Sequence, residues 1–153
     1  GGGTTVMEMA SMLPLNLSAT AFTISPLVAI QLANHPLVNV ILIGGLLSKD
    51  SQVCGGPQVV GYLNEIKFDM CFLGTNGISL ADGVTDSDLD IVMVKKAMIR
   101  ASKRLVVMCI AEKLNSIQRI RVCDLNQINI LLTDINPSEP LLQAYRRENI
   151  QLY

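Results

Sequence analysis

The stretch TDSDLDIVMVKKAMIRASKRLVVMCIAEK, residues 85–113, decides the fold class of this chain. Its first part predicts a helix, because aspartates crowd the expected first turns and basic residues crowd the second half, an order that suits the helix dipole. The aspartates are Asp86, Asp88 and Asp90, and the basic residues are Lys95, Lys96, Arg100, Lys103 and Arg104. The apolar run LVVMCI at 105–110 then predicts a buried strand, so a helix leads directly into a strand, as in α/β proteins.

The same alternation of helices and strands extends outward in both directions. Further helices are predicted at 6–13, 25–35, 57–67 and 137–149, and further strands at 18–23, 37–43, 68–74, 128–134 and 150–153. The unbroken apolar run at 37–43 predicts a strand that is buried on both faces. We therefore predict an α/β fold with a mainly parallel sheet and helices on both faces.

Length, composition and charge restrict the class of protein. A chain of 153 residues, half of them hydrophobic and 16% charged, is long enough for one globular domain with its own core. Because 12 basic residues oppose 13 acidic ones, the chain has no general attraction for nucleic acid or anionic membrane, and any DNA function would need another domain. The longest apolar stretches are too short to span a bilayer, and no secretory signal is visible at the start.

The cysteines and the single histidine indicate a protein without a metal or another cofactor. None of the four cysteines lies in a C-x-x-C pair, and Cys71 and Cys109 lie inside apolar runs, where a thiol behaves as a small hydrophobe. The other two are Cys54 and Cys123. We therefore expect reduced thiols and a cytosolic protein. No cysteine stands at ligand spacing from His35, so we expect no metal site.

The segments that follow the strands are the candidate ligand loops. In open α/β sheets, ligands bind beyond the carboxyl ends of the strands. This rule selects Thr23–Pro26, the segment from Gly44, the segment GTNG from Gly74, and AEK ending at Lys113. The segments share glycines, hydroxyls, an amide and a lysine, which suits a phosphate or a polyhydroxylated ligand. Each segment alone is also compatible with an ordinary turn or a solvated lysine.

The opening GGGTT, residues 1–5, allows two interpretations. It is either a flexible start or a loop whose backbone amides hold an anion at the start of a helix. It matches neither the Walker P-loop nor G-x-G-x-x-G. Asp69 begins its strand and so lies at the opposite end of the sheet, where we expect a structural role.

Catalytic patterns are weak. His35 stands beside Pro36 without a serine or cysteine elbow motif. The acidic run DGVTDSDLD at 82–90 would suit a general base, although an acidic helix start is the more ordinary interpretation.

The order of these segments resembles the effector-binding domain of DeoR-type bacterial transcriptional regulators of sugar metabolism. The resemblance runs through GGGTT, TIS, ILIGGLLSKDSQVCGGP, FDMCFLGTNGIS, GVT, VKKAMIRAS, the strand with EK, and LLTD. It covers nearly all of 1–153 and implies a fold like that of ribose-phosphate isomerase and the CoA transferases. It also implies a helix-turn-helix domain and a first strand before Gly1, with DNA bound only through that domain, and we expect a homo-oligomer.

The resemblance implies a site for a phosphorylated sugar effector at the carboxyl ends of the sheet. The residues that it assigns are Gly2, Gly3, Thr4, Thr5, Ser25, Gly44, Gly45, Gly74, Asn76, Gly77, Lys95 and Lys113. It implies a regulatory sensor that is not an enzyme. A sugar-phosphate isomerase-like enzyme and a domain that only oligomerises are the alternatives.

Four positions depart from the family pattern. Gly1 and Ile24 stand where the family usually has Asp and Asn, and Ile110 begins an IAEK run that keeps only Lys113 of an Asp-x-Ser-Lys-like motif. Ile91 stands where the family usually has Glu, so the best candidate for a catalytic base is missing, which favours the sensor. The identity of the sugar stays open.

Overall fold

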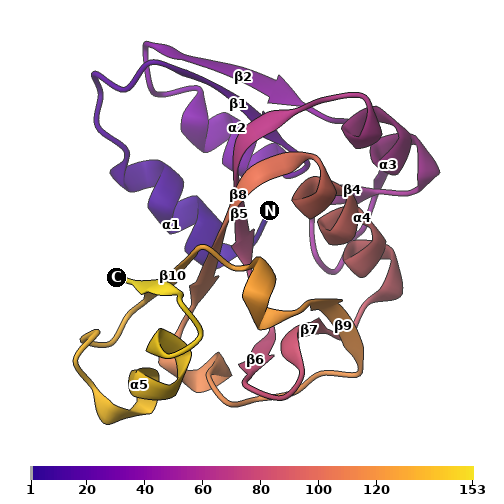
Figure 1. Cartoon of the computed structure of the whole chain (residues 1–153). Coiled ribbons are helices and arrows are strands. Elements are labelled where there is room, and N and C mark those ends of the chain that lie inside the picture. Colours follow the sequence, from indigo (N-terminus) through magenta and orange to yellow (C-terminus); the bar gives the residue numbers. More distant parts are fainter. Residues whose placement is uncertain (1) are drawn as a thin grey trace. The chain divides into compact units, whose positions relative to one another are not determined.

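A computed structural model describes residues 2–153 (Figure 1). The chain divides into two compact units, Gly1–Tyr62 and Leu63–Tyr153, which are described one at a time. Gly1, the first of the four positions that depart from the family pattern, lies outside the described residues.

The first unit carries three helices and two short sheets within its described residues. Its elements are α1 (Thr4–Met12), β1 (Ala19–Thr23), α2 (Pro26–Leu32), β2 (Val38–Leu42), β3 (Leu46–Leu47), β4 (Cys54–Gly55) and α3 (Pro57–Asn64), the last of which runs across the boundary. α2 begins as its sequence predicts, because the Ser25 hydroxyl accepts a hydrogen bond from Val28 N at 3.3 Å and Pro26 occupies the first turn. β1 and β2 run parallel, and β3 and β4 run antiparallel.

β2 is less buried than its apolar run predicts. Ile41 and Leu42 are 36% and 45% exposed, and as neighbours on a strand they point to opposite faces. The prediction of burial on both faces is therefore wrong at this end of the strand. Within the described residues β2 pairs with β1 alone. A strand at the edge of a two-stranded sheet has a neighbouring strand on one side only, which leaves its end more exposed.

The second unit is built on a parallel four-stranded sheet. Its strands stand in the order β11 (Gln151–Leu152), β10 (Ile130–Thr133), β8 (Ser102–Cys109) and β5 (Phe68–Gly74), all parallel to their neighbours. The helices of the unit are α4 (Leu89–Arg100), α5 (Pro140–Arg146) and the short 3₁₀ turns η1 (Ala111–Lys113) and η2 (Leu125–Gln127). Residues 105–109 of β8 are all buried, which makes β8 the centre of this core. The predicted α/β class with a main parallel sheet is confirmed.

An antiparallel sheet that the sequence did not predict adjoins this core. It is formed by β6 (Gly77–Ser79), β7 (Gly83–Asp86) and β9 (Ile120–Cys123). Gly83 has φ of 67°, and a side chain there would overlap the carbonyl oxygen of Cys123 on β9. Only glycine therefore lets β7 approach β9 at this point.

The predicted helix at 85–104 is too long at both ends. Asp86 ends β7, and the helix begins only after Asp88, whose carboxylate accepts hydrogen bonds from the backbone amides of Asp90 and Ile91 at 2.9 and 3.2 Å. Lys103 and Arg104 belong to β8, because strand pairing with β5 takes the chain out of the helix after Ala101. Contacts with distant segments override the local charge pattern here.

Candidate functional site

The loop between β5 and β6 is a tight turn at the carboxyl end of a parallel strand. Gly74 ends β5 and Gly77 begins β6. The Thr75 hydroxyl donates to the Gly77 carbonyl at 2.8 Å and accepts from the Gly77 amide at 3.2 Å, which closes the turn. Asn76 is exposed at its tip.

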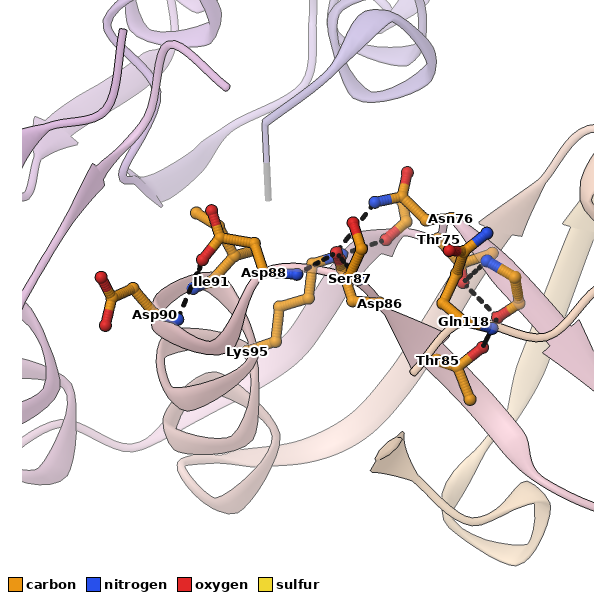
Figure 2. A network of polar contacts seen from close by, with 12 residues as sticks. Thr75, Asn76, Thr85, Asp86, Ser87, Asp88, Asp90, Ile91, Lys95 and Gln118 are labelled. Atoms are coloured by element: carbon orange, nitrogen blue, oxygen red, sulfur yellow. Dashed lines mark hydrogen bonds and ion pairs between the residues drawn. The ribbon is translucent and has the colours of Figure 1, made fainter. Parts of the chain in front are cut away.

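The carboxylate of Asp86 gathers the polar groups around this turn. Figure 2 shows it between Asn76 and Lys95, which lie far apart in the sequence. Its Oδ1 accepts from Asn76 Nδ2 at 2.9 Å and from the Ser87 amide at 2.7 Å, and its Oδ2 lies 2.7 Å from Lys95 Nζ. The side chain of Asp86 is only 3% exposed, so this is a buried ion pair with further hydrogen bonds.

Lys95 connects this pair to the end of β5. Its ammonium also donates to the Gly74 carbonyl at 3.0 Å, and its side chain is 12% exposed. An ammonium has three donors, and within residues 2–153 two of them are used, so the third is available to a ligand. The structure thus brings together Gly74, Asn76 and Lys95, three of the predicted site residues, and Asp86 holds them in place.

The electrostatics keep Asp86 ionised. Burial alone would raise the pKa of its carboxyl group, but the attraction of Lys95 and the hydrogen bonds from Lys95, Asn76 and Ser87 outweigh burial and lower the pKa below its usual range. The pair is therefore neutral as a whole, and it presents hydrogen-bonding groups rather than a net charge.

The turn that carries Lys113 lies beside Gly77. Leu114 forms a bridge with Ile78, and a side chain on Gly77 would come within 2.8 Å of the Ser116 carbonyl oxygen. The amide of Ala111 donates to Asp134 at 2.7 Å, which ties the start of this turn to the end of β10. Within residues 2–153, the ammonium of Lys113 has no hydrogen bond or ion pair, so it is available to an anion.

The first unit holds the other predicted site residues. Gly3 precedes α1 with φ of 129° and no side chain caps this helix, so Thr4 and Thr5 form a first turn with bare amides. A side chain on Gly2 would overlap Val53 and come within 3.0 Å of Ser25 Cβ, so Gly2 and Ser25 lie close together.

The paired glycines of the first unit differ in their surroundings. A side chain on Gly45 would lie 2.6 Å from the Gly55 carbonyl, whereas no atom lies within 4 Å of such a position on Gly44. Both glycines are exposed. The predicted site residues belong to both units, and their union in one site stays a prediction.

The sequence patterns did not single out Asp86, whereas the ordinary interpretation of an acidic helix start holds for Asp88. Asp88 caps α4, and Asp69 pairs with Lys103 at 3.3 Å, with both side chains largely exposed. The sequence does not distinguish Asp86 from the aspartates of the helix start, because its partners Asn76 and Lys95 are nine or ten residues away and form no recognisable motif with it. The one available signal is GVTD itself, where a carboxylate ends a strand.

Other features of the described residues bear on chemistry. All four cysteines are buried free thiols, and burial raises the pKa of Cys109 to about 12 and that of Cys123 to about 11. Across residues 2–153, no group of three His, Cys, Asp or Glu side chains could hold a metal ion. In the same range, no helix combines the length and the apolar character needed to cross a membrane.

Comparison with known proteins identifies the family. Residues 1–135 match the family described as "DeoR C terminal sensor domain". The chain belongs to this DeoR family of sensor domains. It is 30% identical over 149 residues to the HTH-type transcriptional regulator GlpR of Haloferax volcanii, covering 97% of this chain and 56% of that protein.

Two further relatives are also similar to this chain over nearly its whole length. The HTH-type transcriptional repressor GlcR of Bacillus subtilis is 29% identical over 149 residues, which are 97% of this chain and 57% of that protein. The putative aga operon transcriptional repressor of Escherichia coli O157:H7 is 27% identical over 150 residues, covering 98% and 56%. The chain thus spans a little more than half the length of these relatives. They are transcriptional regulators, so the prediction of a sensor rather than an enzyme is confirmed.

Proposed function

We propose that this chain is the sensor domain of a repressor of carbohydrate metabolism and that it binds a phosphorylated sugar as the effector. The observation that carries the proposal is the Asp86–Lys95 pair at the end of β5, which also holds the Asn76 amide of the loop that follows this strand. Such loops at the carboxyl ends of parallel strands are where open α/β sheets bind ligands.

The two kinds of polar group suit the two parts of a sugar phosphate. The neutral pair of Asp86 and Lys95, together with Asn76, offers donors and acceptors for sugar hydroxyls. Lys113, which has no ion-pair partner in residues 2–153, offers a full positive charge for the phosphate. We propose that the amides of Gly2–Thr5 also bind an anionic group, and that Ser25, Gly44, Gly45 and Gly77 are further residues for the effector.

We extend the proposal to the whole regulator through its relatives. Several of them are named HTH-type regulators, and the chain matches only about half of their length. We infer that a helix-turn-helix domain outside these 153 residues binds DNA inside the cell, and that the regulator is a homo-oligomer. A first strand before α1, helices on both faces of the sheet and an overall likeness to ribose-phosphate isomerase belong to the same proposal.

Ligand binding would test the proposal directly. The domain is heated with a panel of aldose and ketose phosphates and with the matching unphosphorylated sugars. A phosphorylated effector at 100 times its dissociation constant should stabilise the domain by about 2.7 kcal/mol. If no sugar phosphate raises the melting temperature, or if the unphosphorylated sugars act equally well, the proposal is wrong.

Calorimetric titration of two matched variants locates the phosphate. Lys113→Ala should lower the affinity for the sugar phosphate by roughly 10- to 150-fold, because a hydrogen bond to a charged group contributes about 1.5–3 kcal/mol. Binding of the unphosphorylated sugar should not change. Lys103→Ala is the control, since Lys103 lies on β8 and pairs only with the exposed Asp69 among the described residues. Equal affinities of the two variants would place the phosphate elsewhere.

A further inference from the structure

The second unit, Leu63–Tyr153, has a pocket that is lined by charged side chains of α4 and β9. α4 packs beside β9 (Figure 1), and a pocket of about 260 Å³ lies between them. It is lined by Lys96, Ile99 and Arg100 of α4 and by residues 121–124 and Gln127 of β9 and η2. The pocket has room for several water molecules or for one phosphate group with a short carbon chain.

The charges that line this pocket are mainly positive. It is lined by three cations and one carboxylate, that of Asp124. Arg121 lies 2.9 Å from Asp124 and 3.5 Å from Asp82, so its charge is already compensated. Lys96 and Arg100 have no ion pair or side-chain hydrogen bond with any residue in 2–153. Two cations one helical turn apart thus lie at the same pocket, and neither has an ion-pair partner among the described residues.

The helix dipole does not explain this arrangement by itself. Arg100 lies in the last turn of α4, where a cation is favourable for the helix alone. Lys96 lies a full turn earlier, and Arg121 comes from a strand rather than from the helix. Residues from separate elements therefore converge on one pocket, which is typical of a binding site rather than of a helix end.

We propose that this pocket is a second anion site, which binds the phosphate group of free phosphate or of a small phosphorylated metabolite. Because a phosphate group carries up to two negative charges, it suits two uncompensated cations better than a ligand with a single carboxylate group does. The site is distinct from that of Lys95, because successive residues on a helix point about 100° apart. α4 thus carries Lys95 toward Asp86 and Lys96 toward the pocket.

Titration by nuclear magnetic resonance tests the second site. Inorganic phosphate is added to the ¹⁵N-labelled domain at constant ionic strength. Saturable shifts are expected at the amides of Lys96, Arg100 and 121–124. The double variant Lys96→Ala/Arg100→Ala should lower the affinity for phosphate by at least about fivefold, which corresponds to about 1 kcal/mol. Lys67→Ala, which removes an exposed lysine away from the pocket lining, is the matched control and should leave the affinity unchanged.

One further addition, that of a hexose phosphate, identifies the source of the phosphate. A hexose phosphate that shifts the same amides supports a metabolite, and shifts from inorganic phosphate alone support the free ion. Shifts that do not saturate, or that are equal in the double variant and the control, would overturn the second site. The proposed effector site is followed separately through Asn76 and Lys113, so failure of either proposal leaves a different pattern of shifts.

Discussion

Asp86 is the residue that connects the other polar groups of the candidate site. It is buried and ionised, and its hydrogen bonds come from a loop, a helix start and the middle of a helix. Such a buried pair stabilises the fold little more than well-packed apolar side chains would. Removing one partner, however, lowers the free energy of unfolding strongly, because the other charge stays buried. Asp86 and Lys95 are therefore expected to be needed both for the fold and for binding.

Lys95→Met tests the structural part of this role. Methionine keeps the length of the side chain but leaves Asp86 buried without its cation. We expect the free energy of unfolding to fall by about 3–5 kcal/mol. Urea denaturation followed by circular dichroism measures this change. The control Lys103→Met removes an exposed lysine and should stay within about 0.5 kcal/mol of the parent. Equal stability of the two variants would show that the pair is not coupled to folding.

The low pKa of Asp86 predicts a loss of stability in acid. Because the pKa is lower in the folded state than its usual value of 3.8, the unfolded chain binds the proton more tightly. The contribution of Asp86 is present above that usual value and is lost as the pH falls through the folded pKa. We expect the free energy of unfolding to decrease between about pH 5 and pH 2.

Asp86→Asn separates this titration from those of the other carboxylates. The variant should be less stable at neutral pH, and its stability should depend less steeply on pH in acid. Urea denaturation at several pH values measures the slope. A slope that is the same in the variant and the parent would assign the acid sensitivity to other groups.

At the scale of elements, α5 is connected to the turn that carries Lys113. The phenol of Tyr145, fully buried on α5, donates to Asn115 Oδ1 at 2.7 Å and lies 3.3 Å from the Ile78 carbonyl oxygen. Burial raises the pKa of Tyr145, so the phenol stays protonated and keeps donating. The hydroxyl of Tyr145 thus contacts both the turn after Lys113 and the middle of β6.

Tyr145→Phe removes this hydroxyl and little else. The variant leaves Asn115 and the Ile78 carbonyl without this donor, so we expect a loss of about 1–3 kcal/mol in the free energy of unfolding. Hydrogen exchange should become faster at residues 113–116. Tyr153→Phe, at an exposed ring, is the control and should change neither quantity. Unchanged exchange at 113–116 in Tyr145→Phe would contradict the connection.

The pairing of β7 with β9 depends on Gly83. Gly83→Ala adds a side chain where φ is 67° and where the Cys123 carbonyl leaves no room. We expect a loss of at least about 2 kcal/mol in the free energy of unfolding. Gly61→Ala is the matched control, because Gly61 lies exposed in α3 with open space around it, and it should stabilise by about 0.5–1 kcal/mol. Thermal unfolding of both variants measures the difference.

At the scale of the whole molecule, the sensor acts only if its ligand prefers one state of the regulator. Because the chain spans about half of its relatives, this prediction concerns the full-length protein. The bound sugar phosphate should change the affinity for operator DNA by about 5- to 150-fold, and DNA should change the affinity for the sugar by the same factor. Fluorescence anisotropy of labelled operator DNA, with and without the ligand, measures both.

Lys113→Ala provides the matching variant for this experiment. It should bind operator DNA as the parent does in the absence of ligand, and it should need a higher ligand concentration to respond. A parent protein whose DNA affinity does not change at saturating ligand would contradict the coupling.

The amino-acid sequence by itself determined the order of the main elements and the family. Ser25 begins α2 through signals that lie within a few residues of it. The family follows from short motifs in a fixed order along the chain. Such features could be predicted because caps, prolines and apolar periodicity act locally.

Only the tertiary structure decided the sheet at β7 and β9, the start of β8 at Ser102 and the central position of Asp86. Val84 pairs with Cys123, and Ser102 pairs with Phe68, so each element depends on a partner far along the chain. In the same way, the polar cluster around Asp86 forms because the fold brings Asn76 and Lys95 to one carboxylate. Hydrogen bonds and ion pairs between distant segments leave no periodic pattern, and therefore local sequence signals could not predict them.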